Sequence, residues 1–275
     1  MNKGYLYAFF TALCWSTAGL FVKFINQSAF VITGCKALIA LLFNLIFMRK
    51  KMRVSLLIIG VGMVQFMVNF TFAMANQMTS VGNAIVLQYS SMIFALIYES
   101  IEKKRLPYLY QIIVIILAMI GMTVFFQDSI SFESTLGNAL AIISGAFFGL
   151  QFFLNADSKA NAESSLMFQY IISILFMLGY MAIKRDINFT SQDVLFIGLG
   201  GLFQTALAGV FFSLCIRRIP AFTANVICMS EIVMAPLWAY LLLQEAFSCF
   251  SLIGSLIMMV ALMYNVTMEY RMRHP

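Results

Sequence analysis

Two ionisable residues lie inside long apolar stretches of the sequence. Glu231 stands near the middle of the apolar segment 221–243, and Lys36 stands about two helical turns inside the segment 30–48. A charged side chain that faces lipid is costly, so we expect both to face the interior of a helical bundle and to have a partner. In one interpretation they bind a small molecule together, with Lys36 on a carboxylate and Glu231 on an ammonium group or a coupling proton. In the other, the two form a salt bridge, or a protonated Glu231 hydrogen-bonds between helices.

Uncharged polar side chains recur on single faces of other apolar segments. Gln65, Asn69 and Asn76 are separated by steps of four and seven, which places them on one helical face. Gln151 and Asn155 follow the same principle at i and i+4. We predict that they line a polar, mostly uncharged cavity; the alternative is that such groups simply bond neighbouring helices, at about 0.6 kcal/mol per contact. The other candidates for this cavity are Trp15, Gln88, Tyr89, Gln169, Gln204 and Ser230.

Pro236 is the proline that falls inside an apolar segment, one turn past Glu231. It removes one backbone hydrogen bond, which predicts a kink or hinge there. The five cysteines show no C-x-x-C and no metal-ligand spacing, so we expect no metal site. We expect no cofactor either.

The elements that must position these residues are membrane helices. Of the 275 residues, 62% are hydrophobic and 10% charged, whereas a soluble domain has about a quarter charged. A bilayer-spanning helix needs roughly 20 apolar residues, so ten spans use about 200 residues and leave only short loops. The sequence therefore predicts an all-α integral membrane protein. The ten expected spans are 4–25, 30–48, 54–76, 81–101, 108–127, 136–156, 164–183, 193–215, 221–243 and 249–268.

The loop cations predict the orientation of these spans. If the N-terminus is cytoplasmic, the loop and terminal Lys and Arg residues lie on the inner side, apart from Lys184 and Arg185. Retention of cations on the inner side sets membrane topology, so we expect both termini inside. The net charge of +6 then reflects topology and affinity for the lipid bilayer, and we expect no nucleic-acid partner because the cations are split among separate loops.

Ten spans divide into two halves of five, which we place at 1–128 and 129–275. Because five is odd, the halves would have opposite orientations in the membrane, as inverted repeats do in secondary transporters. Superposing Glu102 on Glu245 gives an offset of 143 residues, and superposing Asn83 on Asn225 gives 142. The matched hydropathy of the halves carries this prediction more than the identities do.

Several stretches in order along the chain resemble the ten-helix EamA-type transporters of the drug/metabolite transporter superfamily. They are 12–16 (ALCWS), 34–40 (GCKALIA), 78–84 (MTSVGNA), 87–91 (LQYSS) and 229–239 (MSEIVMAPLWA). The chain departs from the family at Lys36, where Arg is frequent, and at Met92 and Ile232, where Pro is frequent. The resemblance implies that spans one to four and six to nine surround a central cavity, with spans five and ten at the flanks.

The resemblance also implies alternating access. We predict a secondary transporter of the cytoplasmic membrane that moves a small metabolite, an amino acid or related compound, in the direction of export. The alternatives are a proton-coupled exporter of organic cations or drugs, and a scaffold or receptor that transports nothing; a homodimer is left open. An enzyme is not expected, because H-E-x-x-H and G-x-S-x-G are both missing from the sequence, and a Walker A sequence for ATP is missing too.

Overall fold

The computed structural model describes residues 3–17, 21, 24–48, 52–127, 134–184, 188–243 and 248–273, and the regular structure in them is helical. The first half comprises α1 (Lys3–Trp15), α3 (Ala29–Phe43) with the π-helical turn η1 (Asn44–Met48), α4 (Leu56–Met78), α5 (Val81–Gln88), α6 (Ser91–Lys103) and α7 (Leu109–Phe125). The second half comprises α8 (Thr135–Ala156), the 3₁₀ turn η3 (Ser158–Ala160), α9 (Ala162–Ile183), α10 (Ser191–Gly200), the π-helical turn η4 (Gly201–Leu207), α11 (Ala208–Cys215), α12 (Ala221–Cys228), α13 (Ser230–Leu243) and α14 (Cys249–Arg273).

These helices correspond to the ten expected spans, which confirms the all-helical prediction, although helix α1 of span one ends at Trp15 and not near residue 25. Span two is α3 with η1, span four is α5 with α6, span eight is α10 with η4 and α11, and span nine is α12 with α13. Within the described residues, seven helices are long and apolar enough to cross a bilayer by themselves, and Leu109–Phe125 and Ala221–Met234 are shorter apolar helices. The assignment of the termini to the cytoplasmic side remains a prediction.

Serine side chains mark where several of the spans begin. Ser28, Ser55, Ser80 and Ser134 each precede a helix, and each hydroxyl accepts a hydrogen bond from the backbone N–H three residues later. Such caps satisfy N–H groups that have no partner inside the helix. The short loops can therefore end one span and start the next within a few residues.

The contacts between helices are symmetric: when each of spans one to five is replaced by its counterpart among spans six to ten, and the reverse, the same pairs of spans are in contact. α4 packs on α8 as α1 packs on α11, and α4 packs on α9 as α3 packs on η4. In the broken spans, α5 packs on α8 as α12 packs on α1, and α6 packs on α8 as α13 packs on α1. The contacts of α3 with α9 and of α7 with α14 map onto themselves, and α6 with α12 joins spans four and nine, which map onto each other as spans. The contacts between the two halves are thus symmetric under the exchange of the halves, as expected when a pseudo-two-fold axis relates them.

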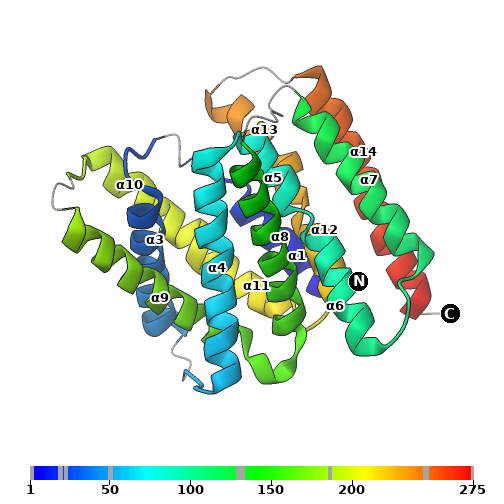
Figure 1. Ribbon diagram of the computed structural model, residues 1–275, viewed down its shortest axis with the longest axis horizontal. Helices are drawn as coiled ribbons and strands as arrows, with labels where there is room; N and C mark the ends of the chain where they lie inside the picture. The colour runs from blue at the N-terminus through cyan, green and yellow to red at the C-terminus, as the bar shows by residue number, and fades with distance from the viewer. Residues whose placement is uncertain are drawn as a thin grey trace.

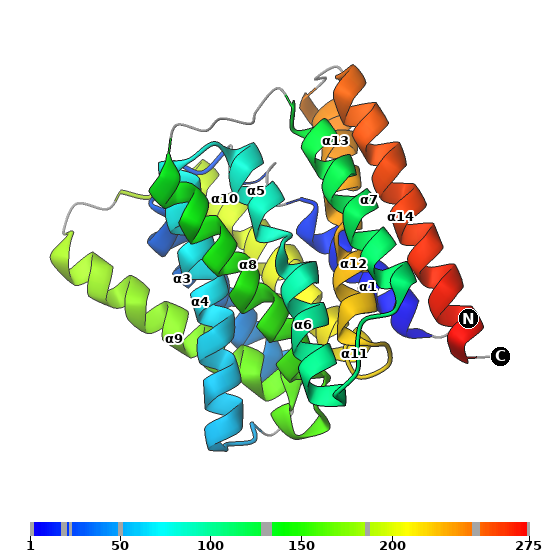
Figure 2. The ribbon, with the colours of Figure 1, turned by 45° about the vertical axis from the view of Figure 1, so that its right-hand side comes forward.

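Spans five and ten lie together at one flank of the bundle. α7 and α14 run side by side at the edge, with α3 and α9 on the opposite side of the molecule (Figures 1 and 2). They approach each other closely at two glycines, because a Cβ added to Gly254 would lie 2.5 Å from the carbonyl oxygen of Gly121. Small residues let helices in membranes approach closely.

Burial separates the interior spans from those that face outward. All eight residues of α12 are buried. The start of α1 and the end of α14 lie near each other at one end of the bundle, which we call the termini side (Figure 2). Large apolar side chains on α14 are exposed instead, including Leu256 at 68% and Met263 at 62%. An apolar exposed surface on a helix of this kind is the surface that contacts lipid tails.

Candidate functional site

Spans four and nine are each interrupted near the middle. Span four breaks at Tyr89 and Ser90, and span nine breaks at Met229. The breaks are local tightenings: the N–H of Ile93 bonds the carbonyl of Ser90 at 2.9 Å, and that of Ile232 bonds the carbonyl of Met229 at 3.0 Å. Bonds of this i to i+3 type inside a helix often mark a functional hinge, and discontinuous helices form substrate and ion sites in secondary transporters.

Tyr89 and Glu231 meet where the two broken helices come together. The Tyr89 hydroxyl donates a hydrogen bond to the Glu231 carboxylate, across 142 residues of sequence. The same separation joins Cys35 Sγ to Met177 Sδ at 3.5 Å. Because 142 is one of the two offsets that align the halves, each contact joins matching positions and lies close to the pseudo-two-fold axis. Tyr89 is 1% exposed and Glu231 is partly buried.

Polar contacts surround this pair on several spans. The side chains of Ser91 and Asn225 hydrogen-bond each other at 3.1 to 3.2 Å, which joins α6 of span four to α12 of span nine. Gln88 Nε2 donates to Ser144 Oγ at 2.9 Å, and Ser144 Oγ donates to the carbonyl of Val68 at 3.0 Å. Spans three, four, six and nine are therefore tied together around Tyr89 and Glu231.

Aromatic rings cover one side of the pair. The rings of Tyr89 and Trp15 lie 6.1 and 6.0 Å from the ring of Phe148, and Trp15 lies 6.0 Å from Phe212. Trp15, a predicted cavity residue, thus belongs to a cluster that reaches Tyr89. Such rings can contact apolar or cationic groups.

Lys36 lies in a different contact, between spans two and eight. Its ammonium group donates to Gln204 Oε1 at 2.7 Å, and Gln204 Nε2 lies 3.5 Å from Thr17 Oγ1 of span one. Lys36 is 9% exposed, and its stem runs across Gly200, where a Cβ would lie 2.5 Å from Lys36 Cε. Gln204 itself stands in the π-helical turn η4. The salt bridge between Lys36 and Glu231, which the sequence left open, is not among the ion pairs of the described residues; Lys36 bonds Gln204 and Glu231 bonds Tyr89 instead.

The polar stripe of span three does not reach the Tyr89–Glu231 pair. Asn69 lines a pocket of about 310 Å³, open mouth included, between α3, α4 and α9, with Thr33 and Ser173 among mostly phenylalanine side chains. Gln65 is 1% exposed, and its amide has no hydrogen-bond partner among the described residues. The side chain of Asn76 lies outside the described residues.

The other predicted cavity residues bond mostly within their own helices. Asn155 Nδ2 donates to the carbonyl of Gln151 at 2.7 Å, Gln169 Nε2 donates to Ser173 Oγ at 2.9 Å, and Ser230 Oγ donates to the carbonyl of Ile227 at 2.7 Å. These contacts fit the alternative interpretation, in which polar groups serve helix structure. α13 is helical through Pro236, whose side chain is outside the described residues, and the interruption of span nine falls at Met229.

A second pocket matches the first under the exchange of halves. It measures about 300 Å³, open mouth included, and lies between η1, α9 and α11, where Asn44, Glu163 and Tyr170 line it. The first pocket is near the start of α3 and the second is at its end, so the two are at opposite ends of span two. Lys36 and Glu231 line neither pocket.

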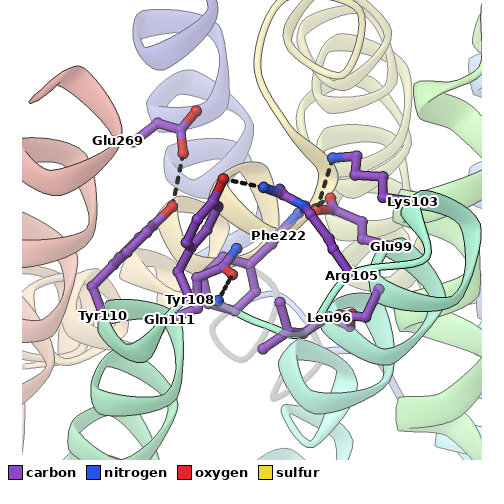
Figure 3. A network of polar contacts seen from close by, with 10 residues as sticks. Leu96, Glu99, Lys103, Arg105, Tyr108, Tyr110, Gln111, Phe222 and Glu269 are labelled. Atoms are coloured by element: carbon purple, nitrogen blue, oxygen red, sulfur yellow. Dashed lines mark hydrogen bonds and ion pairs between the residues drawn. The ribbon is translucent and has the colours of Figure 1, made fainter. Parts of the chain in front are cut away.

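The sequence interpretation missed three buried carboxylates, because it assigned the charges of loops and span ends to topology. Asp193 accepts bonds from the backbone N–H groups of Asn26 and Thr190 at 2.8 and 3.0 Å. Glu99 and Glu269, which are 6% and 9% exposed, belong to a network at the end of the bundle where the termini lie (Figure 3). The one signal in the sequence was the spacing of Glu99 and Lys103 at i and i+4.

Ten helical spans in two matching halves, with a broken helix in each half, define a membrane transporter built from two repeats. The chain belongs to the EamA-like transporter family, which matches residues 2–127 and 135–267. This is a family of transporters and not of enzymes. The family assignment confirms the resemblance drawn from the sequence motifs.

Comparison with solved structures supports the fold. A crystal structure of a protein superposes on the chain with a TM-score of 0.86, at 14% sequence identity, and the match covers 98% of each chain. At this identity the likeness shows the fold alone. No curated protein matches the chain in sequence.

Proposed function

We propose that this transporter is a secondary transporter that exports a small zwitterionic metabolite, of the amino-acid class, across the cytoplasmic membrane. The observation that supports it is the state of the two intramembrane charges. The Lys36 ammonium bonds an amide and the Glu231 carboxylate bonds a phenol, so each partner is neutral. Within the described residues neither charge takes part in an ion pair.

A charge inside a membrane span is costly when no counter-charge accompanies it. A ligand that carries both a carboxylate and an ammonium group would supply the missing counter-charge to each residue. Lys36 would then hold the ligand carboxylate and Glu231 the ligand ammonium. Tyr89 and Gln204 would keep the two side chains in place, and the Trp15 cluster would contact the apolar part of the ligand.

Alternating access fits the arrangement of the spans. We assign the two moving units to 1–128 and 129–275, with both termini on the cytoplasmic side. The breaks at Tyr89 and Met229 would let the half-helices tilt about the Tyr89–Glu231 contact. The remaining predicted cavity residues, including Asn69, Gln151 and Gln169, would reach the ligand in another access state, with Pro236 as a second bending point.

Counterflow in proteoliposomes tests this proposal. Vesicles loaded with an unlabelled amino-acid mixture are assayed for uptake of a labelled neutral amino acid, of its decarboxylated amine and of its deaminated acid. We expect the wild-type protein to exchange the zwitterion and neither the amine nor the acid. Lys36→Met should favour the amine, and Glu231→Gln should favour the acid.

Two exposed charges supply matched controls. Lys184→Met and Glu102→Gln change the same charges outside the bundle core and should leave selectivity unchanged. Exchange of amine and zwitterion at equal rates by the wild type, with no effect of Lys36→Met, would remove the carboxylate role of Lys36.

A second candidate function is proton-coupled export of organic cations. The observation that favours it is the aromatic cluster of Trp15, Phe148 and Tyr89 beside the Glu231 carboxylate, because aromatic faces attract cations. Efflux of a lipophilic cation driven by an imposed proton gradient, lost in Glu231→Gln and kept in Lys36→Met, would select this function. A complete lack of flux with every compound would instead favour a scaffold or receptor.

A further inference from the structure

The half-helix α12 begins in a buried place without a cap of its own. Its first residues, Ala221 and Phe222, are 2% and 0% exposed, and Pro220 at the cap position supplies no side-chain hydrogen bond. The first backbone N–H groups of a helix have no partner inside the helix, and leaving one buried and unbonded is costly. Something outside α12 must therefore satisfy this end.

Glu99 of span four does so. Its Oε1 accepts the backbone N–H of Phe222 at 3.0 Å, although the two residues are 123 positions apart (Figure 3). Its Oε2 lies 3.5 Å from Lys103 Nζ on the next turn of α6. A carboxylate at a helix N-terminus gains from the helix dipole as well as from the charged hydrogen bond. The contact joins the two broken spans at the end of the bundle where the termini lie.

α12 transmits this contact to the Glu231 site. All eight of its residues are buried, and Ser91 holds its middle through Asn225. From Phe222 to Glu231 the helical rise is about 14 Å, at about 1.5 Å per residue. A displacement of the Phe222 end therefore moves the other end, where Cys228 and Met229 precede Glu231.

The start of α5 in span four, which is the equivalent of the start of α12 in span nine, is held by different contacts. Thr79 Oγ1 and Asn83 Nδ2 at the start of α5 donate to Asn138 Oδ1 of α8, at 2.7 and 3.1 Å. That tie is uncharged and connects span four to span six. Among the described contacts, a carboxylate joins spans four and nine directly at the Glu99 end.

We propose that Glu99 is a positioning residue that holds the ends of spans four and nine together and so closes the Glu231 site toward the side of the termini. When the Glu99 contact opens, α12 moves away from α6, and Glu231 becomes accessible from that side. This inference does not depend on the identity of the substrate.

Cys228 is a native reporter for this movement. It is 0% exposed, and its Sγ lies 3.9 Å from the carbonyl of Ala8 in α1, so labelling requires the closed end to open. The full chain, with Cys228 as its sole cysteine, is reconstituted in vesicles, and a terminal tag identifies the side of the termini. A membrane-impermeant thiol reagent is then applied from each side in turn.

We expect Glu99→Ala to raise the labelling rate of Cys228 from the termini side about tenfold and to lower it from the other side, as follows from losing a charged hydrogen bond. Glu99→Gln should lie between Glu99→Ala and the wild type, because its amide oxygen can still accept the Phe222 N–H. Glu102→Gln, on the exposed side of the same helix, should behave as the wild type. Lys103→Met should also have little effect, because the Lys103 side chain is 43% exposed and an exposed ion pair contributes little.

Equal labelling of Glu99→Ala and the wild type from both sides would overturn the proposal, as would an equal shift in Glu102→Gln. If Glu99→Ala does not fold, Glu99→Gln decides: wild-type sidedness together with wild-type turnover would refute the role of Glu99. A shift in sidedness that accompanies a lower maximal rate and an unchanged KM would support it.

Discussion

Tyr89 and Glu231 are the residues whose partnership the sequence could not reveal. Each was expected to face the interior, because a polar group in an apolar span is costly when it faces lipid. Which partner each would find depends on how two spans 142 residues apart are packed, and the pattern of a single helix does not contain that information. The same applies to Lys36 and Gln204. By contrast, Asn155 bonds its own helix, which the sequence allowed as an alternative.

Tyr89→Phe should destabilise the protein, because the Glu231 carboxylate loses the hydrogen bond donated by the phenol. A hydrogen bond to a charged group contributes about 1.5–3 kcal/mol, and we expect a loss of this size in the free energy of unfolding. Denaturation in detergent measures it. Tyr98→Phe is the matched control on the same span, since Tyr98 Oη donates a long hydrogen bond, 3.4 Å, to the uncharged carbonyl of Ala146. An equal loss of unfolding free energy in both variants would mean that the Tyr89–Glu231 hydrogen bond contributes no more to stability than the Tyr98 contact does.

Gly200→Ala should weaken binding of an anionic group through Lys36. The added Cβ would lie 2.5 Å from Lys36 Cε and force the ammonium group away from Gln204. We expect KM for a transported zwitterion to rise about tenfold, which corresponds to about 1.4 kcal/mol. Gly198→Ala on the same helix is the control, because its Cβ has open space, and alanine there should be neutral or slightly stabilising. A rise in KM in both variants would point to a general effect on span eight.

The helices were largely predictable, and their interruptions were not. Long apolar segments between short charged loops identify spans whatever their partners are, so the expected spans agree with the helices, apart from span one, whose helix α1 ends at Trp15. The breaks carry Tyr89, Ser90 and Met229, none of which is a residue that ends helices, so the pattern contained no signal for them. The cap that Glu99 gives to α12 also arises from a contact between spans.

Gly254→Ala should separate α7 from α14. The added Cβ would lie 2.5 Å from both the Gly121 carbonyl oxygen and the Phe125 backbone nitrogen, and backbone atoms cannot move aside as a flexible side chain can. Overpacking of this kind costs about 1–3 kcal/mol, and thermal unfolding in detergent should show it. Gly179→Ala in α9 meets open space and serves as the control. Equal melting temperatures for Gly254→Ala and the wild type would show that the flank pair tolerates a wider spacing.

The whole molecule is organised by the exchange of its two halves. Contacts between spans, the breaks in spans four and nine and the two pockets all follow this exchange. The charges depart from it, since Glu99 ties the broken spans at one end and Lys36 belongs to one half alone. A symmetric scaffold offers two equivalent conformations, and unequal charges decide which one is favoured and what is bound.

The distribution of loop cations makes a prediction for the complete bundle in its membrane. Lys104 follows span four and Lys184 follows span seven, so three spans separate them and they must lie on opposite sides. Because cations are retained on the inner side, Lys104→Cys should react with an impermeant thiol reagent only from the cytoplasm, and Lys184→Cys only from outside. Both positions are exposed, and each is placed in a chain without its native cysteines. Labelling of both residues from the same side would contradict the ten-span arrangement. Labelling of Lys104→Cys from outside and of Lys184→Cys from the cytoplasm would support ten spans but place both termini outside. In that inverted case the Glu99 contact would close the site toward the outside, so this measurement also fixes which face of the membrane Glu99 controls.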